Sequence, residues 1–95
     1  MTVQIESDGA LPPERRRAIE QQARLALTRY SRRIRAVRVR VEGDDHTGCA
    51  VRIAGRKLEP VTAVARAGDA SAALAEAIER ARRAFERRLR QENEQ

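Results

Sequence analysis

The chain has 95 residues, of which 36% are charged and only 2% are aromatic, and its formal net charge at pH 7 is +6. A chain of this length makes one small domain with a modest core, and it has no room for a deep catalytic cleft between domains. With one tyrosine and one phenylalanine, it cannot recognise a partner mainly by stacking on exposed rings. We therefore expect its function to reside on a charged surface.

The predicted elements begin with a short strand in "TVQIES", where Val3 and Ile5 alternate with polar residues. "DGALPPE" ends the strand, and its two prolines are tolerated at the start of a helix, where the first N–H groups lack partners. No apolar run approaches the length of a membrane span, and the first residues lack the charged-then-apolar order of a signal peptide. We expect a cytoplasmic protein without membrane contact.

A first amphipathic helix is predicted from about Pro13 to Arg33. Its apolar stripe recurs at helical spacing and consists of Ile19, Ala23, Ala26, Leu27 and Tyr30. Away from the stripe, or near its edge, lie Arg17, Arg24, Arg29 and Arg32. Residues 14–40 contain ten arginines against two glutamates, whereas the rest of the chain has no excess of positive charge. The positive charge therefore belongs to the first helix and to the strand after it.

Three more strands are predicted between Ile34 and Arg66. The apolar residues of their shared face alternate with residues of the opposite face, and are Val37, Val39, Val41, Cys49, Val51, Ile53, Val61, Ala63 and Ala65. "EGDDHTG" and "GRK" separate the strands as turns, which predicts an antiparallel meander. Pro60 cannot donate to a sheet ladder, so the last strand is expected at an edge, or the proline is expected at the start of that strand.

The last predicted element is a helix that ends at about Gln91, with Asp69 or Ser71 as its N-cap. Its apolar stripe is formed by Leu74, Ala77, Ile78, Ala81, Phe85 and Leu89. Opposite the stripe lie Arg80, Arg83, Arg87 and Arg90. Each of three glutamates precedes an arginine by four residues, in the predicted pairs Glu76–Arg80, Glu79–Arg83 and Glu86–Arg90. Such a pair contributes roughly 0.2–0.5 kcal/mol to a helix.

The element order β-α-β-β-β-α predicts an α+β fold. A strand, a helix and a second strand form a right-handed crossover, so the first two strands are expected to be parallel. Each helix has one apolar stripe and the strands share one apolar face, so both helices are expected on that face. The predicted architecture is a two-layer sandwich of a four-stranded mixed sheet and two helices, in a single domain over residues 1–95.

Nothing in the sequence indicates an enzyme. It has no glycine-rich phosphate loop after a strand, and its single cysteine and single histidine do not make a set of metal ligands. Asp44, Asp45 and His46 are consecutive in a hairpin tip, where an acidic turn is the simplest interpretation. Cys49 alternates with Val51 on the apolar face, as a core residue does. We expect no catalysis, no cofactor, no metal and no small-molecule substrate.

RNA binding is the function that the charge favours. Two neighbouring helices with arginines on their solvent side would present a ridge of guanidinium groups, and such a ridge bridges phosphates without reading base edges. The alternative interpretation is that these charges only solvate the helices. A second positive surface, at Arg38, Arg40, Arg52 and Arg66, would lie on the other face of the sheet. We interpret Arg38 and Arg40 chiefly as the solvated side of that sheet.

In element order, length and spacing the chain resembles the ribosome hibernation-promoting factors, also called ribosome-associated inhibitors or sigma modulation proteins. "VTAVARAGDASAALAEAIERARRAFERR" is similar to the family's final strand and long basic helix, and "RYSRRIRAVRVRVE" to the end of its first helix and its second strand. The resemblance implies a bacterial protein that binds the small ribosomal subunit through ribosomal RNA, occludes the mRNA and tRNA sites, and preserves idle ribosomes under stress. It also implies the short form, without the domain that dimerises ribosomes, and a monomer when free.

The predicted RNA-binding residues are Arg24, Arg29, Arg32, Arg33, Arg80, Arg83, Arg87 and Arg90. Of these, Arg80, Arg83 and Arg87 match by position the basic row on the family's second helix. On the first helix, the lysines usual in the family fall on uncharged residues of this chain, and the arginines are assigned by their charge. The second helix begins "DAS", where the family commonly has a methionine and an aromatic residue after the aspartate, so a packing or contact detail differs there.

Two other functions remain open. A double-stranded-RNA-binding module has the order α-β-β-β-α, so the chain could be such a module with an added first strand. A non-catalytic protein-interaction domain on the same scaffold would instead present the glutamates of the second helix to a protein partner.

Overall fold

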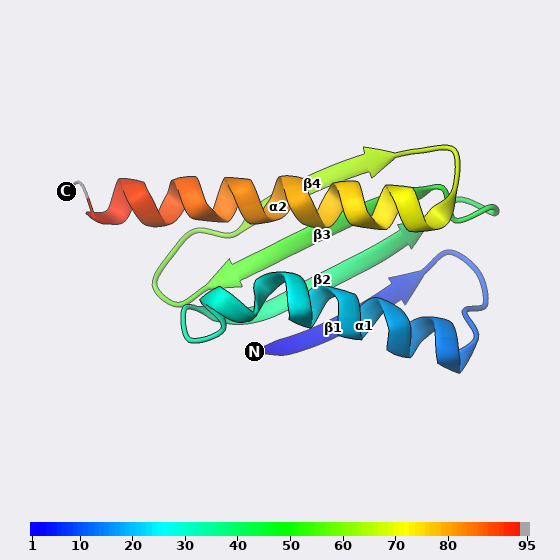
Figure 1. Ribbon diagram of the computed structural model, residues 1–95, viewed down its shortest axis with the longest axis horizontal. Helices are drawn as coiled ribbons and strands as arrows, with labels where there is room; N and C mark the ends of the chain where they lie inside the picture. Colours follow the sequence, from blue (N-terminus) through cyan, green and yellow to red (C-terminus); the bar gives the residue numbers. More distant parts are fainter. Residues whose placement is uncertain (94–95) are drawn as a thin grey trace.

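The computed structural model describes residues 1–93 and has the predicted element order β-α-β-β-β-α (Figure 1). The elements are β1 (Thr2–Ser7), α1 (Pro13–Leu27), the 3-10 helix η1 (Thr28–Tyr30), β2 (Ile34–Glu42), β3 (Gly48–Gly55), β4 (Val61–Arg66) and α2 (Ala70–Asn93). The strands form one sheet in the order β1-β2-β3-β4. β1 is parallel to β2 and the other neighbours are antiparallel, so the predicted mixed sheet and the edge position of β4 are confirmed.

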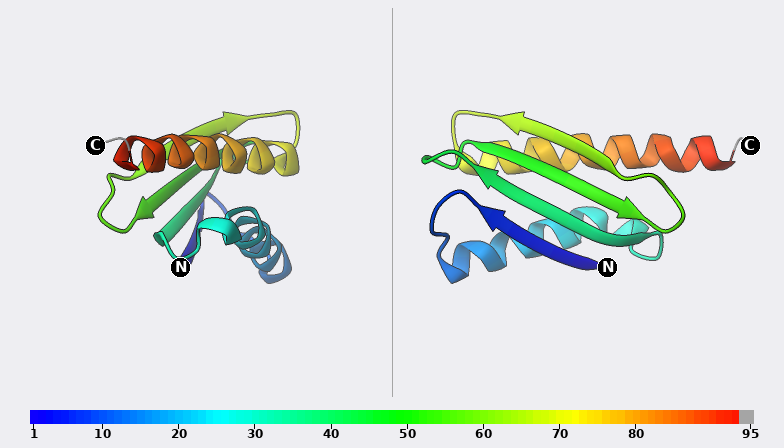
Figure 2. Two further views of the ribbon diagram at one scale, coloured as in Figure 1. Left: turned by 60° about the vertical axis from the view of Figure 1, so that its left-hand side comes forward. Right: turned by 180° about the vertical axis from the view of Figure 1, so that it is seen from behind.

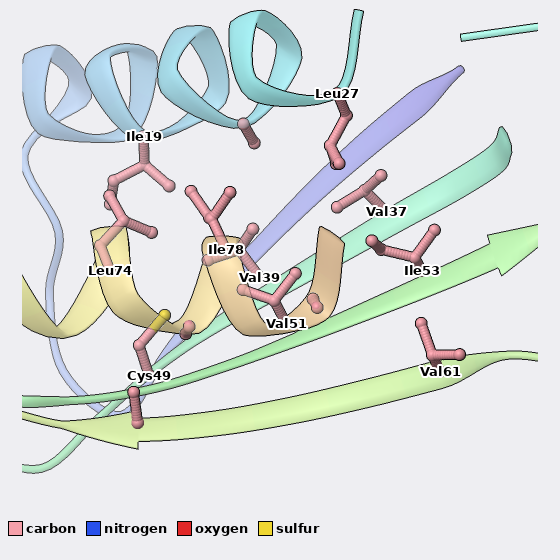
Figure 3. Packing of buried hydrophobic residues seen from close by; sticks show 14 of the residues in the cluster. Ile19, Leu27, Val37, Val39, Cys49, Val51, Ile53, Val61, Leu74 and Ile78 are labelled. Carbon is pink, nitrogen blue, oxygen red and sulfur yellow. The ribbon is translucent and has the colours of Figure 1, made fainter. Parts of the chain in front are cut away.

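Both helices cover one face of the sheet, and the opposite face carries no helix over residues 1–93 (Figure 2). Between the layers, buried apolar residues from β2, β3, β4 and both helices form the core (Figure 3). Val3 and Ile5 of β1 pack against this core and are partly buried. Phe85 of α2 is fully buried, and its ring meets the Tyr30 ring edge-on, with the centroids 6.0 Å apart. None of the helices described has the length and apolar character needed to cross a membrane.

The first helix ends earlier than the predicted limit at Arg33. α1 ends at Leu27 and continues as η1, and a turn connects η1 to β2. The Thr28 hydroxyl donates to the Arg24 carbonyl at 2.6 Å, a bond back to the preceding turn that bends helices. The chain must also reverse at this point to begin β2. As a result Arg29 lies on η1, and Arg32 lies in the turn before β2 rather than on a helix.

The second helix begins at one of its two predicted caps. Asp69 Oδ1 accepts a hydrogen bond from the Ala72 N–H at 2.8 Å, so Asp69 is the N-cap rather than Ser71. α2 then packs over β3 and β4. At Gly55 of β3 a Cβ atom would lie only 2.8 Å from Cε1 of Phe85, so the absence of a side chain there admits the buried ring.

Loss of the cap at Asp69 should destabilise the domain moderately. We expect Asp69→Ala to lower the free energy of unfolding by about 1 kcal/mol, because it leaves N–H groups of the first turn without an acceptor. Urea unfolding followed by circular dichroism measures this loss. Ser71→Ala is the matched control and should leave stability within about 0.5 kcal/mol. A larger loss from Ser71→Ala than from Asp69→Ala would contradict the assignment of the cap.

Candidate nucleic-acid interface

The predicted arginines do not form one ridge along the two helices. α1 lies over the β1 side of the sheet, and α2 lies over β3 and β4 (Figure 1). Because β1 and β4 are the two edges of the sheet, the outer flanks of the helices face in opposite directions. The predicted residues are therefore distributed over separate parts of the surface.

A groove of about 310 Å³ between α2 and β4 brings together three of the predicted arginines. We term it the α2–β4 groove, and its lining consists of Thr62, Ala63, Arg80, Arg83, Ala84 and Arg87. The arginines follow one another at positions i, i+3 and i+7 of α2, so they share one flank of the helix. The small side chains of the two alanines leave the space between the helix and the strand open.

Two of the three arginines of the α2–β4 groove form weak ion pairs that can be exchanged. Arg80 pairs with Glu76, and Arg83 Nε lies 3.2 Å from Glu79 Oε1, so two of the predicted i,i+4 pairs are confirmed. No ion pair within residues 1–93 involves Arg87. All three arginines are exposed. Because exposed helix pairs contribute little, these guanidinium groups are able to take phosphate oxygens as partners instead.

A second groove, of about 250 Å³, lies between η1 and α2 and is lined by Arg29, Tyr30, Glu86, Leu89 and Arg90. The Tyr30 hydroxyl donates a hydrogen bond to the Glu86 carboxylate, which raises the pKa of Tyr30 and lowers the pKa of Glu86. The guanidinium carbon of Arg29 is 5.8 Å from the centroid of the Tyr30 ring, within the range of cation–π attraction. The lining of this η1–α2 groove thus contains two of the predicted arginines and one carboxylate.

The predicted pair between Glu86 and Arg90 is wrong. Glu86 pairs with Arg82, and its carboxylate also accepts the hydrogen bond of the Tyr30 hydroxyl. Arg82, which is not among the predicted residues, is partly buried, and its Nε donates to Glu79 at 3.0 Å. The bonds to these carboxylates raise the pKa of Arg82. Its guanidinium is therefore engaged within the fold.

The remaining predicted residues lie apart from the α2–β4 groove. Arg24 is at the β1 edge, on the other side of the molecule, where its Nη1 donates to the Met1 carbonyl at 3.1 Å. Arg33 pairs with Glu92, near the end of α2. Arg32 is exposed in the turn beside Arg33. Arg32 and Arg33 thus lie at the end of the molecule where α2 ends, whereas Arg24 does not belong to either groove.

Arginines of both helices also contact the backbone of the two edge strands. On β1, Arg16 Nη1 donates to the Ile5 carbonyl at 2.8 Å, and the Arg24 contact is to Met1, immediately before the strand. On β4, Arg80 Nη1 donates to the Val64 carbonyl at 2.9 Å. Arg80 therefore contacts the sheet edge and lines the α2–β4 groove at the same time.

Several basic residues near the turn before β2 are not among the predicted residues. The start of β2 pairs with the end of β3, and the Arg56 N–H donates to the Arg33 carbonyl at 2.9 Å. The β3–β4 loop, with Arg56 and Lys57, therefore lies beside Arg35. The predicted meander implies that the β3–β4 loop lies next to the start of β2, because antiparallel neighbours bring the start of one strand to the end of the next. Candidates chosen from the helices alone leave these residues out.

The residue types that could catalyse a reaction or bind a metal have structural roles in this fold. Asp45 accepts hydrogen bonds from the Thr47 hydroxyl at 2.8 Å and from the Thr47 N–H at 3.2 Å, which lowers the pKa of Asp45 and stabilises the β2–β3 turn. Cys49 is buried, and desolvation raises the pKa of its thiol to about 11. Within residues 1–93, no three side chains of His, Cys, Asp or Glu lie close enough together to hold a metal ion.

Comparison with known proteins gives one kind of match, at the level of the fold. No family model matches the sequence, and no curated protein sequence matches it. A solved structure described as a ribosomal subunit interface protein from Coxiella burnetii superposes with a TM-score of 0.64. The match covers 84% of this chain and 88% of that chain at 13% sequence identity, so what the two proteins share is the fold.

Proposed function

We propose that this domain binds the small ribosomal subunit through ribosomal RNA and inhibits translation by occluding the mRNA and tRNA sites, in the manner of a hibernation factor. The observation that carries the proposal is the α2–β4 groove, where three exposed guanidinium groups of one helix line a single space. Guanidinium groups bind phosphate in a planar, bidentate geometry, and a row of them on a helix fits the phosphates of structured RNA.

Three further observations support the proposal. The net charge of +6 attracts the domain to nucleic acid over a longer range than single contacts do. The similarity in fold to a protein described as a ribosomal subunit interface protein supports a ribosomal partner over free RNA duplexes. The domain is also elongated, with extents of 43 × 22 × 18 Å, a shape suited to lying along a channel. Inhibition would then follow from occupancy and would need no chemistry.

Sedimentation through a sucrose gradient tests the proposal. We expect the protein to migrate with small subunits or whole ribosomes in lysates of starved cells, and purified protein to lower translation in vitro. The association should weaken with salt, by roughly 20–40-fold between 50 and 200 mM if three phosphate contacts are made. Absence from ribosomal fractions of both growing and starved cells would contradict the proposal. Binding to RNA duplexes without ribosomes would favour the double-stranded-RNA-binding module, and a flat salt titration would favour a protein partner.

A further inference from the structure

The helix-free face of the sheet carries a row of hydrogen-bond donors. In the strand register Gln4 of β1 pairs with Arg38 of β2, Arg38 pairs with Arg52 of β3, and Arg52 pairs with Thr62 of β4. All four side chains are exposed, and each has a group that donates hydrogen bonds. Both helices lie behind the sheet in the right-hand view of Figure 2. Arg38 and Arg52 each stand between two buried residues of their strands, so by alternation they face away from the helices.

Beside this row the sheet has a hollow of about 310 Å³, which we term the sheet hollow. Its lining consists of Gln4, Arg35, Ala36, Val37, Arg38, Arg52, Ala54 and Pro60. Ala36 and Ala54 are register partners on neighbouring strands, and they make a low floor because their side chains end at Cβ. The longer side chains of Arg35, Arg38 and Arg52 also line the hollow, so three positive charges belong to its lining. The arrangement is a basic depression in a sheet surface.

The charges around the sheet hollow are not balanced. Arg38 and Arg52 stand directly opposite each other on antiparallel strands, an arrangement that is unfavourable for like charges. Arg38 Nε lies 3.6 Å from Glu6 Oε1, but Arg40 shares the same carboxylate at 3.4 Å. No ion pair within residues 1–93 involves Arg35 or Arg52. A bound anion would supply the negative charge that this part of the sheet lacks.

The occupant that fits this surface is the phosphate backbone of an RNA strand. The three arginines are exposed, so a single small anion would be held weakly, whereas a polymer gains from each further contact. Arg56 and Lys57 of the β3–β4 loop add two further positive charges at the same end of the sheet. Tyr30 and Phe85 pack together on the helix side, so no aromatic ring offers base stacking in the sheet hollow. The contact would therefore be to phosphates.

We propose that the sheet hollow binds the phosphate backbone of a second RNA segment, on the face opposite to the helices, so that one domain holds two RNA segments at once. This inference rests on the proposed function and extends it. An RNA segment in the α2–β4 groove and another in the sheet hollow would be tied together by the domain between them.

The test compares two double variants in their affinity for a fluorescein-labelled oligouridylate, measured by anisotropy. Arg35→Gln with Arg52→Gln removes two charges from the sheet hollow without breaking an ion pair. Arg17→Gln with Arg66→Gln is the matched control, since it removes the same charge and Arg66 lies at the opposite end of the sheet. Both are made in a background with glutamine at the three arginines of the α2–β4 groove, which then contributes little.

We expect the variant of the sheet hollow to bind the oligouridylate about tenfold more weakly than the control, through the loss of two charge-assisted contacts at exposed positions. Its slope of log K against log salt should be flatter by about 1.4. In the wild-type protein, oligouridylate should shift the backbone amide NMR signals of residues 35–38 and 52–54. Thermal unfolding of the variant should be unchanged or raised, because a like-charge pair is removed, and this checks that the variant is folded.

Equal affinity of the two variants, or amide shifts confined to α2, would overturn the inference. Tighter binding of an oligoglutamate peptide than of the oligouridylate would also overturn the inference. So would inorganic phosphate that binds as tightly as the oligouridylate does per phosphate group. Ribosome sedimentation decides the proposed function separately. If sedimentation with ribosomes fails while the oligouridylate still binds the sheet hollow, the proposed function falls and the RNA site remains.

Discussion

Replacing Arg80, Arg83 and Arg87 with glutamate should abolish the association of the protein with ribosomes. Each substitution removes a guanidinium group from the α2–β4 groove and puts a carboxylate in its place, so phosphates that were attracted are repelled. Glutamine at the same positions should cause a partial loss, in which the slope of log K against log salt flattens by about 2–3. Pelleting with small subunits over a salt series measures both effects.

The fold should survive the triple substitution. The new carboxylates face Glu76 and Glu79, but like-charge pairs on an exposed helix cost only roughly 0.2–0.5 kcal/mol each. That cost is small beside a domain stability of about 5–15 kcal/mol. Glutamate at Arg15, Arg17 and Arg66 is the matched control, with the same change of net charge outside the groove. A folded groove variant that pellets with ribosomes like the wild type would remove α2 from the binding site.

Replacing Phe85 with alanine should destabilise the domain far more than the loss of the helix cap at Asp69. Phe85 is fully buried, lies against Gly55 of β3, and meets the Tyr30 ring at 6.0 Å, so its removal opens a cavity at the junction of α2, η1 and β3. Truncation of a buried phenylalanine costs about 3–5 kcal/mol. For a domain of this size we expect the melting temperature to fall by roughly 15 °C or more.

Leu25→Ala is the control for the Phe85 substitution, because Leu25 is a large apolar residue that is 70% exposed. Its removal should change stability by no more than about 0.5 kcal/mol. Guanidinium chloride unfolding, followed by far-UV circular dichroism, measures both variants with the same probe. A loss below about 1 kcal/mol for Phe85→Ala would contradict the packing of α2 on β3, since a buried ring cannot be removed at so little cost.

The fold could be predicted because each element has a clear hydrophobic period. Alternation at Val37 and Val39 marks β2, and Leu74 and Ile78 mark the buried face of α2. Only one arrangement buries both helical stripes and the single apolar face of the strands together. The end of the first helix could not be predicted in this way, because Tyr30 continues the helical stripe after α1 has ended. Tyr30 packs against Phe85 of α2, and this tertiary contact keeps it on the apolar side although it does not lie on an α-helix.

The candidate site could be predicted only in part. The spacing of Arg80, Arg83 and Arg87 fixes them on one flank of α2 whatever the rest of the chain does, and the structure brings them to one groove. The relative position of the two helices depends on which strands each one covers. That position places Arg24 far from the three groove arginines of α2. Ion-pair choice also depends on tertiary neighbours. Glu86 also stands four residues from Arg82 on α2, and helical spacing alone does not decide between Arg82 and Arg90. The contact of Glu86 with Tyr30 comes from η1, which lies next to it in the fold.

The arginine contacts to β1 and β4 have a consequence for how copies of this protein meet. The Asp8 N–H donates to the Val41 carbonyl of β2, so by alternation the carbonyls of Met1 and Ile5 point outward from the sheet. These outward carbonyls are the ones that accept from the arginines of α1. A strand from another molecule would need the same acceptors in order to add to this edge.

The opposite edge is protected in the same way. The Ala67 N–H donates to the Thr47 carbonyl, so by alternation the Val64 carbonyl points outward from the sheet. The Arg80 guanidinium donates a hydrogen bond to this carbonyl. Side chains suited to phosphate thus also guard the sheet against edge-to-edge polymerisation. For Arg80 the two roles compete, because a phosphate that draws its guanidinium away uncovers the β4 edge. We therefore expect the β4 edge to be covered in the free domain, and to be uncovered when a phosphate takes the Arg80 guanidinium.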